Sequence, residues 1–144
     1  MLTKNFEKLK TCVEEHVEQG RVTQGIYWKE GRGGYIGCLN HSDSPSPAEE
    51  RYGLPKDLQE VADEIFEELP ADEAKAFFAA FPAAVGCNGK DLWGISKCDM
   101  KYDYGWSLAE RVSEKESITD FYRRGRDLLL KLVAEAPIKT KEDN

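Results

Sequence analysis

The sequence predicts a mainly α-helical protein: a single globular domain of about five helices with one short β-hairpin. The chain has 144 residues, which is close to the usual size of one domain. Apolar side chains recur at helical spacing over most of its length. Residues 25–39 depart from this spacing, because they are rich in aromatic, β-branched and glycine residues. We expect the domain to cover residues 1–137 and residues 138–144 to form a flexible tail.

Five segments carry an apolar stripe together with a start or stop signal. In chain order they are residues 2–19, 46–52, 55–69, 71–81 and 108–137. Gly20 and Gly53 end the first two segments, and Pro70 separates the third from the fourth. We expect Pro82 to interrupt the fourth helix, and the last helix to pause or bend near Ser117.

Two regions lack a helical pattern. The first contains two strand-like runs, residues 25–28 and 35–39, separated by the turn-forming residues 29–34. Two strands alone are only marginally stable in water, so this hairpin must lie against helices. The second region, residues 86–105, is irregular, and we expect its aromatic side chains to fold back on the helices. These side chains are Trp93, Tyr102 and Tyr104.

Composition and charge restrict the classes of function. The net charge of −7 opposes non-specific binding to nucleic acid, which depends on cations that contact phosphates. No apolar run is long enough to cross a membrane, and the charged residues 1–16 do not resemble a signal peptide. We therefore expect a cytoplasmic protein whose four cysteines are reduced. The basic stretch 122–126 is interpreted as the solvated face of a helix, with contact to an anion as the alternative.

Residues 31–43 form the stretch in which we expect a ligand site. Its glycines, at positions 31, 33, 34 and 37, match neither the dinucleotide-binding nor the Walker pattern, and a strand-like run follows them in place of a helix. We interpret them as a hairpin turn in which glycine permits positive φ angles. A turn does not require Arg32, so an anion-binding nest that uses its guanidinium group stays open as a hypothesis.

The cysteines and histidines are weak candidates for a metal site. Cys38 and His41 have a spacing that suits one metal ion, but Cys87 and Cys98 lie too far apart in sequence for the usual zinc pattern. Cysteine is also a common small buried residue, and we interpret Cys38 in this way. His16 lies near the apolar stripe of the first helix and is interpreted as a histidine at the edge of the core. We expect no metal ion and no cofactor.

The segments QGIYW, RGGYIGC, YGLP and IFEELP follow one another as in a group of small bacterial and phage proteins, which the chain resembles over about residues 16–93. Members of the group share Q-G-x-Y, then R-G-C-x-x-G-C, then a G-[IL]-P helix that ends in I-F-E-x-L-P. Gln24 becomes a candidate residue through this match. Gly34 stands where the group usually has a cysteine, so a cysteine pair with Cys38 is not available in this chain. The group has no established activity, and its phage members imply a role at the boundary between phage and host.

Two functions remain open. The first is a non-catalytic interaction protein, of phage or mobile-element type, that binds a host protein or a small anionic ligand. Its carboxylates, with helix 55–69 as the candidate face, would suit a basic, nucleic-acid-binding partner. The second is a small hydrolase or transferase that uses His41 with Asp43 or Cys38, and Arg32 to hold substrate charge. We favour the first, because the chain lacks a convergent acid, base and nucleophile. The candidate binding residues are Gln24, Tyr27, Trp28, Arg32, Cys38, His41 and Asp43.

Overall fold

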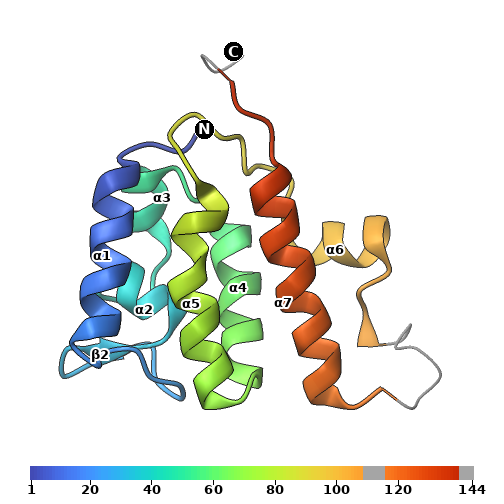
Figure 1. The fold of residues 1–144 in the computed structure, drawn as a ribbon, viewed down its shortest axis with the longest axis horizontal. Coiled ribbons are helices and arrows are strands. Elements are labelled where there is room, and N and C mark those ends of the chain that lie inside the picture. Colours follow the sequence, from blue (N-terminus) through green and yellow to red (C-terminus); the bar gives the residue numbers. More distant parts are fainter. Residues whose placement is uncertain (109–115, 140–144) are drawn as a thin grey trace.

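Helices make up most of the structure, a computed structural model that describes residues 1–108 and 116–139 (Figure 1). Each of the five predicted segments contains a helix: Phe6–Glu18 (α1), Ser46–Tyr52 (α3), Lys56–Glu68 (α4), Ala71–Val85 (α5) and Ile118–Glu135 (α7). A mainly α-helical fold is therefore confirmed. The described residues contain two further helices, Tyr35–Asn40 (α2) and Lys97–Tyr104 (α6), so the predicted number of about five is too low. None of the described helices is long and apolar enough to cross a membrane.

The core lies between the long helices, with α5 between α1 and α7, and α4 against both α5 and α7 (Figure 1). The buried apolar side chains of the described residues form one cluster. Its centre is aromatic, with Phe66 from α4 and Phe77, Phe78 and Phe81 from α5. Tyr35 enters from α2, and its ring makes edge contacts with three of these phenylalanines. The aromatic cluster therefore anchors the short helix α2 to the long helices.

The predicted second strand, residues 35–39, is helix α2. Gly34 is its N-cap, and residues 33–40 are all buried. A helix that is buried on every side has no polar face, so residue spacing does not distinguish it from a strand. The observed strands, Trp28–Lys29 (β1) and Arg32–Gly33 (β2), pair antiparallel and are shorter than predicted. Glu30 and Gly31 form the turn between them with φ angles of 55° and 76°, which suits the twist of a hairpin.

Close packing accounts for two of the glycines that we expected to serve a turn. A Cβ atom added at Gly37 would lie 1.5 Å from the carbonyl oxygen of Tyr27, and one added at Gly33 would lie 1.8 Å from the same atom. Among the four glycines of residues 31–37, positive φ occurs only at Gly31. Glycine therefore lets the segment before β1 run directly against α2.

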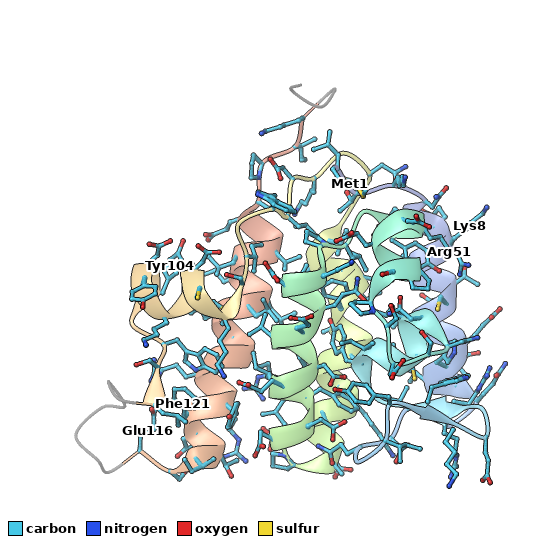
Figure 2. The ribbon with its side chains drawn as sticks, turned by 180° about the vertical axis from the view of Figure 1, so that it is seen from behind. Met1, Lys8, Arg51, Tyr104, Glu116 and Phe121 are labelled. Carbon is cyan, nitrogen blue, oxygen red and sulfur yellow. The ribbon has the colours of Figure 1, made fainter. Side chains whose placement is uncertain are left out.

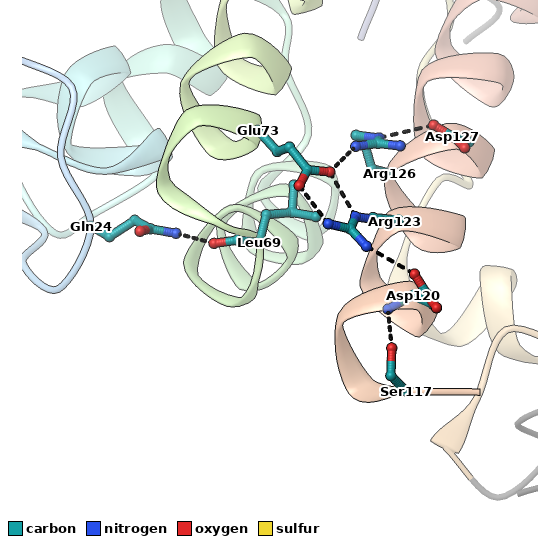
Figure 3. Close-up of polar contacts among 8 residues, drawn as sticks. All are labelled: Gln24, Leu69, Glu73, Ser117, Asp120, Arg123, Arg126 and Asp127. Carbon is teal, nitrogen blue, oxygen red and sulfur yellow. Dashed lines mark hydrogen bonds and ion pairs between the residues drawn. The ribbon is translucent and has the colours of Figure 1, made fainter. Parts of the chain in front are cut away.

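The structure departs from the prediction at Pro82, at the start of the last helix and in the predicted tail. Pro82 does not interrupt α5, which continues to Val85, and Pro82 is itself part of the buried face of that helix. Ser117 is the N-cap of α7, and its hydroxyl accepts a 3.0 Å hydrogen bond from the Asp120 amide (Figure 3). The predicted helix before Ser117 falls largely on residues 109–115, outside the described residues. In the predicted tail, the Lys139 amide donates to the carbonyl of residue 89 at 2.8 Å, and residues 140–144 also lie outside the described part.

Candidate functional site

The hairpin brings two of the predicted site residues into contact. Trp28 lies in β1 and His41 directly follows α2, and their rings stack with centroids 4.2 Å apart and planes 3° apart. His16 of α1 joins them, because its Nε2 atom lies 2.9 Å from Nε2 of His41. The guanidinium carbon of Arg21 lies 5.2 Å from the centre of the Trp28 ring. His16 is buried, as predicted, whereas His41 is exposed. We refer to His16 and His41 as the histidine pair.

The surroundings of the histidine pair favour the neutral form of His41. Partial burial lowers the pKa of His41, and electrostatic interactions with His16, Arg21 and Arg51 lower it further. Among the described residues, no hydrogen bond joins His41 to Asp43, which is exposed. The base and orienting carboxylate of a hydrolytic site are therefore not assembled in this arrangement.

Gln24 and Cys38 make structural contacts. Nε2 of Gln24 donates 2.7 Å hydrogen bonds to the carbonyl groups of Phe66 and Leu69, which ties the segment before the hairpin to the end of α4. Figure 3 shows the bond to Leu69. Cys38 is fully buried, and its thiol donates to the Gly33 carbonyl at 3.2 Å. Burial raises the pKa of Cys38 to about 12, so its nucleophilic thiolate form is scarcely populated at neutral pH.

Carboxylate side chains of α4 accept hydrogen bonds from backbone N–H groups near the glycines. The Ile36 amide donates to Oδ1 of Asp63 at 3.1 Å, and the Gly25 amide donates to Oε2 of Glu67 at 2.8 Å. Burial raises the pKa of both carboxyl groups, which belong to α4. A small anion would have to displace acidic side chains from these amides, so this region is unfavourable for an anion nest.

Tyr27 and Arg32 are accessible members of the predicted site. Tyr27 is 54% exposed and borders a hollow of about 190 Å³. Nη2 of Arg32 donates to the Gly20 carbonyl at 3.3 Å, and within the described residues no carboxylate forms an ion pair with it. These two side chains provide a small accessible surface at the hairpin.

The basic stretch 122–126 is paired with carboxylates of the chain itself. Arg123 forms two hydrogen bonds of 2.7 Å with Glu73, and Nη1 of Arg126 lies 3.0 Å from the same carboxylate (Figure 3). Hydrogen bonds from Arg123 and then Arg126 lower the pKa of Glu73 to about 2. Arg124 forms a similar double contact with Glu116. Each guanidinium group of this stretch therefore already has a carboxylate partner, and Glu73 joins α5 to α7.

The cysteines do not converge on a metal site. In residues 1–108 and 116–139, no group of three or more His, Cys, Asp or Glu side chains could hold a metal ion. All four cysteines are free thiols. The carbonyl of Cys87 accepts a hydrogen bond from Thr3 near the N-terminus, whereas Cys98 is exposed on α6. The four-ligand zinc set considered from the sequence is therefore not assembled.

A groove runs between α4 and α6, which lie on the same face of the molecule in Figure 2. It consists of three hollows of about 540, 320 and 240 Å³. The first and second share Asp57 and Ser96 as lining residues, and the second and third share Glu64 and Lys97. Because neighbouring hollows share residues, they form one continuous surface, which we call the α4–α6 groove.

Exposed aromatic side chains lie at the border of this groove and on α6. Trp93 borders the first hollow and is 72% exposed, and Tyr102 and Tyr104 of α6 are 76% and 53% exposed. The prediction that these three fold back on the helices is wrong. Leu92 and Ile95 take the buried positions of that segment, so Trp93 between them faces solvent. A large exposed aromatic side chain at the border of a hollow, such as Trp93, is typical of an interaction site.

Carboxylates outnumber ammonium groups in the groove. Asp57, Glu60 and Glu64 lie on one face of α4, as their spacing requires. Nζ of Lys97 lies 2.7 Å from Glu64, whereas Asp57 and Glu60 have no ion-pair partner in the described part of the chain. Five carboxylates and three lysines line the groove: Glu49, Asp57, Glu60, Glu64, Asp99, Lys56, Lys97 and Lys101. The groove is therefore acidic, and it includes part of the helix face singled out in the sequence.

Sequence reasoning missed the pairing of His16 and the exposure of Trp93. The only local signal for His16 is its position four residues after Cys12, and nothing in the sequence connects it with His41. The chain matches no protein-family model, and no curated protein or solved structure is significantly similar to it. The geometry of the described residues is therefore the basis on which a function is inferred.

Proposed function

We propose that the chain is a non-catalytic interaction protein of the cytoplasm that binds another protein through the α4–α6 groove. The observation that carries this proposal is the exposed Trp93 at the border of a hollow of about 540 Å³ that continues into two further hollows. Aromatic side chains next to such hollows are frequent anchors of protein interfaces. The free state of all four cysteines agrees with a reducing compartment.

The charges of the groove favour a partner segment that carries lysine or arginine together with an apolar side chain. Asp57 and Glu60 are available to a cationic group, and the Trp93 ring offers a face on which a guanidinium group can stack. The net charge of −7 adds long-range attraction toward a basic protein. Nucleic-acid-binding proteins are partners of this kind. The resemblance to bacterial and phage proteins supports a partner in a bacterial host.

The enzyme alternative and the small-anion alternative receive less support from the geometry. A nucleophilic Cys38 would need access to substrate, but its side chain is fully buried. A general base at His41 would need Asp43 or another orienting carboxylate, whereas its Nε2 atom faces His16. An anion site at the glycines would compete with Asp63 and Glu67 for the backbone amides.

Selection from a displayed library of random short peptides tests the proposal. We expect the enriched peptides to combine basic residues with an aromatic or aliphatic residue, and their affinity to fall as the salt concentration is raised. Loss of a central aromatic anchor costs about 2 kcal/mol or more, so Trp93→Ala is expected to weaken binding by roughly thirtyfold.

Tyr27→Ala is the matched control, because Tyr27 is also an exposed aromatic residue but lies at the hairpin. Its affinity for the enriched peptides should stay within about twofold of the wild type. Binding that depends on Tyr27 and Arg32 instead of Trp93 would contradict the proposal, because the interaction surface would then lie at the hairpin. A library that yields only acidic peptides would contradict the proposed partner chemistry.

A further inference from the structure

The hydrogen bonds of the histidine pair determine where its protons lie. Nδ1 of His16 lies 2.6 Å from the backbone carbonyl of Cys12. A carbonyl only accepts, so this nitrogen carries the proton, and in the neutral ring Nε2 of His16 presents a lone pair. That lone pair faces Nε2 of His41 at 2.9 Å, so His41 is the donor in this contact. The two Nε2 atoms are therefore directed at one point and share a single proton.

We propose that His16 and His41 form a two-histidine site for a divalent transition-metal ion, such as Zn²⁺, Ni²⁺ or Cu²⁺, which takes the position of the shared proton, while that proton moves through solvent to Nδ1 of His41. Imidazole nitrogen suits these ions. Two nitrogens bound to tetrahedral Zn²⁺ at about 2.0–2.1 Å lie about 3.3–3.4 Å apart. The pair would therefore have to open by only about 0.4 Å from its distance of 2.9 Å. Water would complete the coordination.

The positions of both rings are already fixed by other contacts. Metal-binding histidines usually donate a hydrogen bond from their other ring nitrogen, as Nδ1 of His16 does to the Cys12 carbonyl, and this bond fixes the orientation of the ring. His41 stacks on Trp28, and its φ angle of 53° places it in the left-handed region at the end of α2. His41 is exposed, so an ion can reach the site from solvent. Binding would therefore need little reorganisation of the fold.

The other groups around the pair limit the affinity and exclude a thiolate ligand. Arg21 and Arg51 act on His41 with positive charge, which opposes a dication and makes the site a weak, reversible one. Burial raises the pKa of Cys12, and its sulfur lies 3.7 Å from Nδ1 of His16, the nitrogen that is not directed at the site. Tyr52 and Glu15 interact with Cys12.

Calorimetric titration of the metal-free full chain with Zn²⁺ or Ni²⁺ alone tests the proposal. We expect one ion per chain, with an affinity that falls as the pH is lowered and protons compete for the imidazoles. His41→Asn removes one ligand, and asparagine tolerates the left-handed φ angle. This variant should bind roughly tenfold more weakly or not at all. Cys12→Ser and Cys98→Ser should bind like the wild type.

An NMR measurement on the wild-type chain keeps the test independent of the variants. With Zn²⁺ bound, the ¹⁵N resonances of Nε2 in both histidines should shift, while Nδ1 of His16 keeps its proton. The proposal is overturned by the absence of saturable binding, by binding in His41→Asn within twofold of the wild type, by loss of binding in Cys12→Ser, or by an unshifted Nε2 resonance in either histidine.

Discussion

Gly37→Ala tests the close contact between α2 and the segment before β1. In a solvent-exposed helix, replacing glycine with alanine raises the free energy of unfolding by about 1 kcal/mol. In this protein the added Cβ atom would lie 1.5 Å from the carbonyl oxygen of Tyr27, whereas real Cβ contacts are hardly ever shorter than 3.0 Å. The segment would therefore have to withdraw by about 1.5 Å. The sign of the effect is thus expected to be opposite to that of helix propensity.

The size of the loss follows from the contacts that such a shift would disturb. The Gly34 amide donates to the Ile26 carbonyl at 3.1 Å, and this hydrogen bond contributes about 1 kcal/mol. The stacked rings of Trp28 and His41 contribute about 1 kcal/mol more. Overpacking adds about 2 kcal/mol, and the helix-propensity gain offsets about 1 kcal/mol. The net expectation is a loss of about 3 kcal/mol, or a fall in Tm of roughly 10 °C.

Urea unfolding followed by circular dichroism measures this loss, and Gly34→Ala is the matched comparison. The Cβ atom added at Gly34 would lie 2.9 Å from Oε1 of Glu67, the end of a flexible side chain that can shift at the cost of weakening its hydrogen bond from the Gly25 amide. We expect this variant to lose less than about half as much stability as Gly37→Ala. If Gly37→Ala unfolds at the same urea concentration as the wild type or at a higher one, the contact with Tyr27 is wrong.

Three further perturbations test other parts of the fold. Tyr35→Phe should raise the free energy of unfolding by about 1 kcal/mol, because the buried Tyr35 hydroxyl has no hydrogen-bond partner in the described structure; a clear loss in urea unfolding would contradict this. Lys90→Met should cost about 2–3 kcal/mol, since Nζ of Lys90 donates to the carbonyls of Ala84, Val133 and Ala134 at the ends of α5 and α7; a loss below 1 kcal/mol would count against that role. The pKa of His41 is lowered from 6.5, so the unfolded chain binds more protons than the folded one and stability should fall as the pH drops through about 6.5. His41→Asn should flatten this part of the pH profile of unfolding, and an unchanged profile would refute the assignment.

Local patterns predict the long helices because each of those helices has one buried and one solvated face. α4 illustrates this, since Leu58, Val61 and Ile65 are buried and its acidic residues face outward. α2 could not be predicted in this way, because all six of its residues are buried and no polar face reveals the helical period. The sequence pattern does not predict α6 for the opposite reason, because Met100 is the only buried residue of that helix.

The candidate sites depend on contacts between distant segments, which local patterns do not contain. Gln24 and Trp28 are candidate residues in the sequence, but their contacts follow only from the fold. Gln24 donates a hydrogen bond to the Phe66 carbonyl, and Trp28 stacks on His41. The occupation of the amides near the glycines by Asp63 and Glu67 also depends on how α4 packs against α2. The acidic face of α4 is local and was visible in the sequence. The position of Trp93 beside that acidic face is not visible in the sequence.

The central claim, that the α4–α6 groove binds a basic protein segment, is tested most directly by NMR. Amide shifts of the ¹⁵N-labelled chain would be recorded during titration with a basic peptide enriched in the library selection. The account predicts that the shift changes concentrate at Asp57, Glu60 and Trp93 and along α6, and that Trp93→Ala abolishes them. Changes confined to the hairpin around Tyr27 and Arg32, or the same changes with and without Trp93, would contradict it.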